Sequence, residues 1–250
     1  MRWLNDDWNT LPRTDEPEEI DNPGQPFDDI ARSMGDVARS NRMFGGTQTV
    51  LYHVVRLLRD VPPGTPIRIL DIATGSADIP HALHAWGAKR GLPLTIVGVD
   101  NLSAMLRLAR HASPETFLVQ ADALHLPFAP RTFDLALCAL AFHHLGFDGS
   151  AQVLRAMDAL TTRGFVVSDL RRDQVTLRGV QAGLGLIRSH PFTRHDGPAS
   201  VRRAFTPREY EKMVIQSGAK NVRVRAHWYF RMALVQRKTE TLGNGYIVGR

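Results

Sequence analysis

Three aspartates each follow a short apolar segment, at the point where a parallel β-strand would end. Asp71 follows the β-branched run at 67–70, Asp100 closes the run at 94–99, and Asp122 comes shortly after the run at 117–120. In open parallel sheets, ligands bind beyond the carboxyl ends of the strands. The three acids therefore predict one ligand site at that edge of a sheet.

The loop after Asp71 indicates what charge this ligand carries. A dinucleotide-binding turn would read Gly-x-Gly-x-x-Gly, but its three glycine positions here are Ala73, Gly75 and Asp78. A pyrophosphate needs unopposed backbone N–H groups at the helix N-terminus, and the carboxylates of Asp71 and Asp78 would repel it. The loop favours a ligand that carries an amino group and a sulfonium over a dinucleotide.

Histidines supply the candidate acid–base groups. His143 and His144 follow the apolar segment 133–140, and His195 stands beside Asp196. Imidazole titrates near neutral pH, so each of the three can accept a proton from a substrate hydroxyl. The alternative for the pair at 143–144 is an architectural role, with an imidazole bonding the backbone.

Other residues could hold the substrate itself. Guanidinium groups bind phenolate, carboxylate or keto oxygens, and an aromatic ring or a lid residue could complete the site. The candidate substrate-binding residues are Arg42, Arg171, Arg172, Phe192 and Arg202. Solvated arginine is the alternative for the charged members of this set.

The elements that must position these residues alternate along the chain. Helical patterns are expected at 28–59, 79–90, 103–111, 151–160, 175–187 and from 206, and a loop at 190–204. Strands are expected at 67–70, 94–99, 117–120, 133–140, 164–170, 222–225 and 229–235. This alternation of strand and helix patterns predicts an α/β fold with a mainly parallel sheet and helices on both faces. A closing hairpin would contribute one antiparallel strand.

We expect four segments along the chain. Residues 1–29 hold nine Asp and Glu with several prolines and predict an acidic, loosely ordered N-terminal arm. Residues 30–63 predict an N-terminal helical lid, and 64–240 the main domain, with a substrate-cover insertion at about 171–206. Residues 241–250 are expected to form a C-terminal tail.

Composition excludes several classes of protein. The formal net charge is +6, but the arginines are spread along the chain without a dense basic block, so a nucleic-acid partner is not expected. Cys138 is the one cysteine, which excludes an internal disulfide and a Cys-cluster zinc site, and no metal is expected. The N-terminus lacks a secretory signal pattern and no apolar run is long enough to span a membrane, so we expect a cytoplasmic protein.

Four motifs together resemble the class I S-adenosylmethionine-dependent methyltransferases. They are Leu-Asp-x-x-x-Gly at 70–75, Val-Asp at 99–100, Ala-Asp-Ala at 121–123, and Phe-Asp-Leu-Ala at 133–136 followed by Phe-His-His-Leu at 142–145. The resemblance covers about residues 67–170. It is strongest to the small-molecule branch, which includes quinone-biosynthesis and natural-product methyltransferases.

The resemblance implies a Rossmann-like sheet of seven strands with the last strand antiparallel, and S-adenosyl-L-methionine as cofactor. It places Asp71, Ala73 and Gly75 at the methionine part, Asp100 and Asn101 at the ribose, Asp122 and Ala123 at the adenine, and Ala139 beneath the sulfonium; Thr74 is also expected to bind the cofactor. The family's first and last loop glycines are Ala73 and Ala77 here.

The expected reaction is methyl transfer to a small aromatic, polyketide-like or quinone-like acceptor, most simply at oxygen. The alternatives are methylation of such an acceptor at carbon, methylation of RNA, or cofactor binding without catalysis. An RNA base methyltransferase would carry an Asn/Asp-Pro-Pro-Tyr type motif, where this chain has Ala-Leu-Ala-Phe at 139–142. The oligomeric state is left open.

Overall fold

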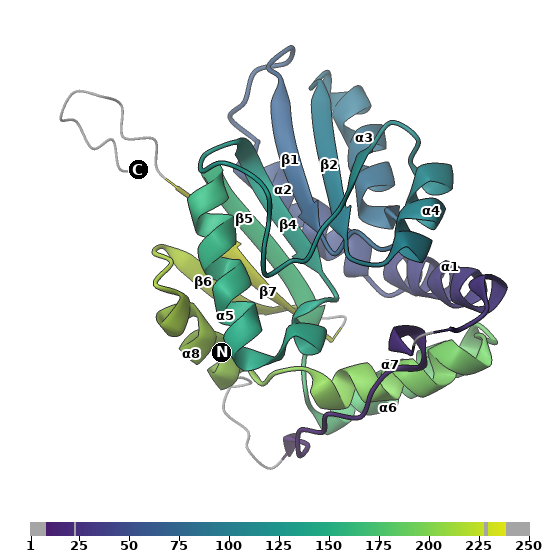
Figure 1. Cartoon of the computed structure of the whole chain (residues 1–250). Coiled ribbons are helices and arrows are strands. Elements are labelled where there is room, and N and C mark those ends of the chain that lie inside the picture. Colours follow the sequence, from purple (N-terminus) through teal and green to yellow (C-terminus); the bar gives the residue numbers. More distant parts are fainter. Residues whose placement is uncertain (1–8, 23, 228–229, 239–250) are drawn as a thin grey trace.

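The computed structural model describes residues 9–22, 24–227 and 230–238, and one seven-stranded sheet organises them (Figure 1). The strand order is β3-β2-β1-β4-β5-β7-β6. β7 runs antiparallel to its neighbours β5 and β6, and the pairs among β1–β5 are parallel. The strands are β1 Ile67–Ile72, β2 Leu94–Asp100, β3 Phe117–Gln120, β4 Phe133–Ala139, β5 Thr161–Leu170, β6 Val222–His227 and β7 Arg231–Gln236. The predicted fold class is confirmed.

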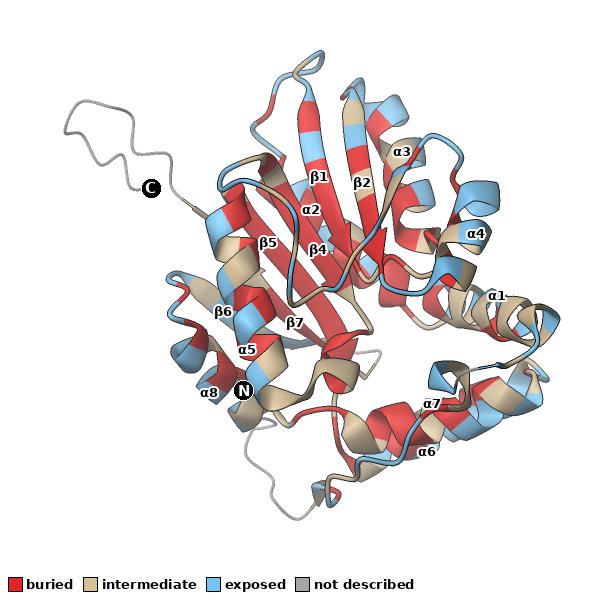
Figure 2. Ribbon diagram, viewed as in Figure 1, coloured by how far each residue is buried: buried red, intermediate tan, exposed pale blue. Residues whose placement is uncertain are grey.

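Helices cover both faces of this sheet. They are α1 Phe27–Met43, α2 Gly46–Leu57, α3 Asp78–Arg90, α4 Ser103–Ala112, α5 Phe142–Leu160, α6 Gln174–Leu186, α7 Pro191–Arg203 and α8 Pro207–Ser217, with a short 3-10 helix η3 at Glu19–Asp21. Strand residues alternate between two apolar cores because successive side chains point to opposite faces. In β1, Ile67 and Ile69 pack with α2 and α3, whereas Leu70 and Ile72 pack with α5 and α8. Strands β1, β4, β5 and β7 are accordingly buried along most of their length (Figure 2), whereas the edge strands β3 and β6 are not.

Helices α1, α6 and α7 lie beyond the carboxyl ends of the parallel strands (Figure 1). Only α1 of the predicted 30–63 lid lies over that edge, because α2 puts Val50 and Val54 into the core against the sheet. The predicted lid and the predicted boundaries of the main domain remain predictions.

The expected loop at 190–204 is wrong, because the structure forms helix α7 there. Pro191 occupies the first turn, where its missing N–H costs nothing, and the His190 ring accepts a hydrogen bond from the Phe192 N–H at 3.4 Å. Gly197 lets α7 approach α6 closely, since a Cβ there would lie 2.4 Å from Leu184 Cδ1. Packing overrides the weak helix propensity of a segment rich in His, Asp, Gly and Pro.

The described part of the N-terminal arm is packed against the domain, which differs from the predicted loose order. Leu11 and Glu18 are buried, and the Asp196 carboxylate of α7 accepts hydrogen bonds from the backbone N–H groups of Glu19 and Ile20 at 2.7 and 3.2 Å. Arg172 donates to the backbone carbonyl of Leu11. Acidic composition predicts disorder only when no buried partner exists, and here α7 supplies one. Residues 1–8 and the predicted tail at 241–250 lie outside the described residues.

Candidate active site

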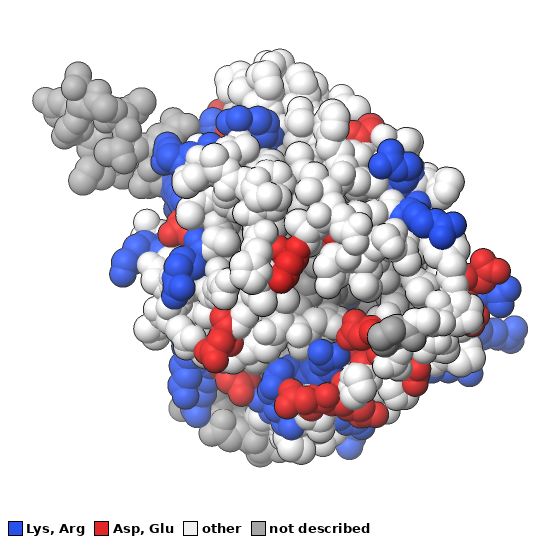
Figure 3. Space-filling view, in the orientation of Figure 1, with Lys and Arg blue, Asp and Glu red and all other residues white. Residues whose placement is uncertain are grey.

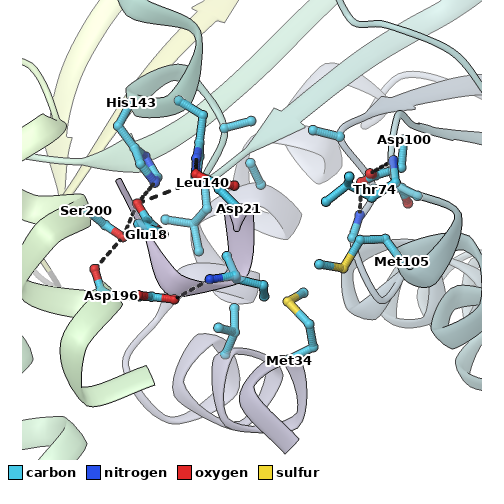
Figure 4. A pocket seen from close by; sticks show the side chains of 18 of the residues that line it. Glu18, Asp21, Met34, Thr74, Asp100, Met105, Leu140, His143, Asp196 and Ser200 are labelled. Atoms are coloured by element: carbon cyan, nitrogen blue, oxygen red, sulfur yellow. Dashed lines mark hydrogen bonds and ion pairs between the residues drawn. The ribbon is translucent and has the colours of Figure 1, made fainter. Parts of the chain in front are cut away.

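A cavity of about 480 Å³ opens at the carboxyl ends of β1, β2 and β4, beneath α1, α7 and the arm. Two groups of polar side chains line it on opposite sides (Figure 4). Thr74 and Asp100 belong to the first, and Glu18 and His143 to the second. Met34 of α1 lies between the two groups in this view.

The first group is built on the loop after β1. Thr74 Oγ1 donates to Asp71 Oδ2 at 2.7 Å, and the Thr74 N–H donates to the Val99 carbonyl of β2 at 2.9 Å. The loop lies so close to β2 that a Cβ on Gly98 would come within 2.9 Å of Thr74 Oγ1. The backbone of Ala73 lies in the left-handed region, with φ 55°. Glycine adopts this conformation most readily, and here alanine adopts it.

Two buried carboxylates give this end of the cavity its electrostatic character. Burial raises the pKa of Asp71 to about 7; the Thr74 hydrogen bond opposes the rise, and the charges of Asp78 and Asp100 add to it. Asp100 accepts hydrogen bonds from the backbone N–H groups of Leu102 and Gly75, both at 3.0 Å, and burial still raises its pKa. A cationic ligand beside these carboxylates would stabilise their charged forms.

The third aspartate is more open to solvent. Asp122 accepts a hydrogen bond from the Leu124 N–H at 2.8 Å and lies 3.1 Å from the His125 ring. The Leu124 hydrogen bond is the main cause of its lowered pKa, and His125 adds to it. The cavity lining includes all the residues predicted to bind the cofactor, namely Asp71, Ala73, Thr74, Gly75, Asp100, Asn101, Asp122, Ala123 and Ala139.

The second group centres on His143, in the first turn of α5. Its Nδ1 lies 2.7 Å from Oδ1 of Asp169, a fully buried residue of β5, and its backbone N–H donates to the same carboxylate at 3.2 Å. Burial alone would raise the pKa of Asp169, but the charge and hydrogen bonds of His143 and the Leu170 N–H hold that pKa below its ordinary value. Asp169 therefore orients the imidazole, with Nε2 pointing away from β5.

Glu18 of the arm faces the two histidines. Its Oε1 lies 3.5 Å from His143 Nε2 and 3.6 Å from His144 Nε2, and it accepts a hydrogen bond from Ser200 Oγ at 2.8 Å. Burial raises the pKa of Glu18 to about 7, although the charge of His144 opposes the rise. His144 Nδ1 lies 3.0 Å from Asp21 Oδ2.

The structure does not bring the other predicted catalytic and substrate residues to this cavity. His195 is half-exposed and lies 2.9 Å from Asp196 and 3.4 Å from Glu16, both through ring nitrogens. Arg172 is buried in a structural role, with both Glu209 oxygens at 2.7 Å. Arg42, Arg171, Phe192 and Arg202 are likewise absent from the lining. The loop predicted at 190–204 misplaced several of them, because helix α7 turns only one of its faces toward the cavity.

Further residues complete the lining. Glu18 and Asp21 come from the arm, and Arg203 from the end of α7 lies 3.2 Å from Asp21. From α1, the Asn41 side chain donates to Asp78 at 3.0 Å and accepts from Arg231 at 3.0 Å. No local pattern marks Glu18 or Asp21, because the partners of both lie more than 120 residues away.

Comparisons with known proteins agree with the fold. Residues 69–164 match the family model described as a methyltransferase domain. The demethylmenaquinone methyltransferase of Thermotoga maritima is 34% identical over 130 residues, which cover 52% of this chain and 52% of that protein. The chain therefore spans about half the length of this curated relative.

Solved structures with the same fold include methyltransferases determined with ligands. The magnesium protoporphyrin IX methyltransferase of Synechocystis PCC 6803, with bound SAM, gives a TM-score of 0.53 at 14% identity, covering 85% of this chain and 92% of that one. The plantazolicin methyltransferase in complex with a substrate analog and SAH gives 0.59 at 14% identity, covering 82% and 74%. The matched domain and the shared fold support the resemblance to the class I S-adenosylmethionine-dependent methyltransferases that the four motifs carry.

Two further observations concern partners. No helix among the described residues is both long and apolar enough to cross a membrane. On the face shown in Figure 3, acidic and basic side chains are interspersed, without a broad field of either sign.

Proposed function

We propose that this protein transfers a methyl group from S-adenosylmethionine to an oxygen atom of a small, planar acceptor of aromatic, polyketide-like or quinone-like character. The observation that carries the proposal is a single cavity lined by the acidic loops of β1–β3 on one side and by the Asp169–His143 pair on the other. Transfer requires a cofactor and an acceptor held next to each other, and one continuous cavity provides for both.

The residues of the first group fit the proposed cofactor. When bound, S-adenosylmethionine supplies a methyl group on a positively charged sulfur. Asp71 offers a buried carboxylate toward a cationic amino acid end, and Asp100 can accept hydrogen bonds from a ribose diol. Asp122 would meet the exocyclic amine of adenine, and the small side chain of Ala139 leaves space beneath the sulfonium.

The acceptor would occupy the side nearer α6 and α7. Apolar side chains line that part of the cavity, and apolar walls with few placed polar groups are typical of small-molecule sites. They include Leu140, Leu145, Val180 and Leu184. Among the arginines considered for acceptor binding, Arg203 would take this role. Arg42, Arg171, Arg172 and Arg202 do not line the cavity.

We assign to His143 the role of accepting the proton from the acceptor's hydroxyl group. Asp169 holds Nδ1, so Nε2 remains to receive the proton of an acceptor hydroxyl at the cavity surface. Catalysis otherwise consists of holding the two reactants close and aligned, and of excluding water with α1 and the arm.

Methylation at carbon is the second candidate, because the Thermotoga maritima relative is named for demethylmenaquinone, which supports a quinone-like acceptor. The test is incubation with methyl-labelled S-adenosylmethionine and a panel of phenols, hydroxyquinones and polyketide-like enols. Carbon-13 spectra distinguish O-methyl from C-methyl products. We expect an O-methyl product. Transfer only to RNA, or cofactor binding without transfer to any acceptor class, would overturn the proposal.

A further inference from the structure

Three side chains of the kinds that bind metal ions converge at the acceptor end of the cavity. They are Glu18, His143 and His144, and their candidate ligand atoms all lie within 4.8 Å of one another. Glu18 Oε1 lies 3.5 Å from His143 Nε2 and 3.6 Å from His144 Nε2. All three residues line the cavity, so the cluster is open to a small molecule within it.

The second nitrogen of each imidazole is already engaged by a carboxylate. His143 Nδ1 faces Asp169 at 2.7 Å, and His144 Nδ1 faces Asp21 at 3.0 Å. Each carboxylate holds the ring proton on Nδ1, so Nε2 presents a lone pair toward Glu18. Metal-binding histidines are oriented in this way, by a carboxylate behind the ring.

The distances at Glu18 fit shared coordination better than direct hydrogen bonds. Separations of 3.5 and 3.6 Å exceed the usual N–H···O range. Two ligand atoms, each about 2.0–2.1 Å from one zinc ion, lie roughly 3.3–3.6 Å apart at angles between tetrahedral and trigonal. Unprotonated imidazole nitrogens that face one carboxylate oxygen also repel it unless a cation lies among them.

The charges around the cluster favour a divalent cation. Among the described residues in contact with it, the carboxylates are Glu18, Asp21 and Asp169, and the guanidinium is Arg203, at 3.7 Å from Glu18 Oε1. In the state that binds a metal, with both imidazoles neutral and the three carboxylates ionised, the excess is two negative charges. The Glu18 and His143 side chains are only 6% and 3% exposed, so water cannot balance that excess efficiently.

We propose that Glu18, His143 and His144 bind one divalent transition-metal cation, with Zn²⁺ as the best match to two imidazoles and one carboxylate. Three protein ligands leave a fourth position open toward the cavity, as in catalytic zinc sites. That position would take the acceptor oxygen, and this clause alone rests on the function proposed above. His143 Nε2 would then hold the ion and could not take the acceptor's proton; the ion would stabilise the acceptor oxyanion, and the hydroxyl proton would pass to solvent water.

This inference replaces the expectation from the sequence that no metal is bound. The sequence contains the adjacent histidines but gives no sign that a glutamate 125 residues earlier lies against them.

The test is a metal titration of the full chain after treatment with a chelator. Zn²⁺ binding is followed by calorimetry, and Co²⁺ binding by its visible absorption, which reports the coordination geometry. We expect one ion per chain, with affinity lowered at least about 100-fold in Glu18→Gln and in His144→Ala. Asp21→Asn, which removes only the carboxylate behind His144, should lower the affinity about 10–100-fold.

A second histidine pair provides the matched control. His53 of α2 and His227 of β6 face each other with their Nε2 atoms 2.8 Å apart. His53→Ala should leave the affinity for Zn²⁺ unchanged. Zn²⁺ affinity that survives Glu18→Gln, or that is lost in His53→Ala, would overturn the proposed site.

The same preparations separate this inference from the proposed function. Zn²⁺ binding lost in Glu18→Gln, together with no methyl transfer by any form of the protein, would leave the metal site standing and overturn the function. Methyl transfer at full rate in the presence of chelator, with no Zn²⁺ binding, would overturn the metal site and leave the proposed function standing.

Discussion

The two ends of the cavity are built in different ways. At the end near β1 and β2, the polar contacts join neighbouring strand–loop units, such as Gly75 with Asp100, 25 residues apart. At the other end, the His143–Asp169 pair is also 26 residues apart, but the remaining contacts join distant segments, such as Asp21 with His144, 123 residues apart, and Glu18 with Ser200, 182 apart. The first end is a property of the parallel sheet, whereas the second is assembled by helices and an arm added to it.

This difference suggests a division of labour. The end near β1 and β2, the strand–loop end, would hold the proposed cofactor, and its geometry follows from where parallel strands end. The other end, lined by Glu18 and His143 and called the assembled end, would hold the acceptor. Acceptors vary between proteins of one fold, because function lies in sites added to folds. Variants at the two ends should therefore have separable effects.

The largest expected effect is on the rate of the chemical step. His143→Ala removes the imidazole oriented by Asp169, and single-turnover methyl transfer should fall on the order of 10²–10⁴-fold. His195→Ala is the control, since His195 lies outside the cavity lining, and its rate should match the wild type. A full rate in His143→Ala with a reduced rate in His195→Ala would reverse the assignment.

The next effect is on stability. Arg172 donates to the carbonyls of Leu11 and Ala204 and to both oxygens of Glu209, so it joins the arm to α7 and α8. Arg172→Met should lower the free energy of unfolding by about 3 kcal/mol, the lower part of the range for removing one partner of a buried ion pair, because Glu209 keeps some contact with water.

Denaturant unfolding measures this change, with Arg202→Met as a surface control expected within about 0.5 kcal/mol of the wild type. The affinity of folded Arg172→Met for S-adenosylhomocysteine should be unchanged. If stability were unaltered while acceptor binding weakened, Arg172 would be a substrate residue, as the sequence predicted.

A smaller effect concerns pH at the strand–loop end. Asp71 has a pKa raised to about 7, so below this pH the free protein holds a proton there that a cationic ligand must displace. The affinity for S-adenosylmethionine should therefore rise between pH 5 and pH 7, by at most about tenfold per pH unit, and level off above.

Calorimetry across this range should show the rise in the wild type and a flatter profile in Asp71→Asn. Glu18→Gln is the control, because Glu18 also has a pKa near 7 but lies at the other end of the cavity. If Glu18→Gln flattened the profile and Asp71→Asn did not, the cationic part of the cofactor would lie at the assembled end.

The sequence predicted the strand–loop end nearly completely. Asp71, Asp100 and Asp122 each lie at, or within two residues of, the carboxyl end of a strand, and parallel pairing then places all three at one edge. The antiparallel β7 was also expected, from two β patterns close together near the C-terminus.

The assembled end was predicted only in part. His143 and His144 were found because they follow β4 directly. Glu18 was missed because its partners, Ser200 and the two histidines, become neighbours only once α7 has folded over the strand ends. The same error explains why His195 and Phe192 were expected in the site, since a helix fixes which side chains face the cavity and a loop does not.

The central claim, that one cavity has a cofactor end and a separate acceptor end, is tested most directly by calorimetric titration with S-adenosylhomocysteine. The wild type should bind, and Asp100→Ala should lose about 1.5–3 kcal/mol for each charge-assisted hydrogen bond removed from the ribose. His143→Ala, at the opposite side of the same cavity, should bind as the wild type does. Absence of binding by the wild type, or an equal loss of affinity in His143→Ala and Asp100→Ala, would contradict the account.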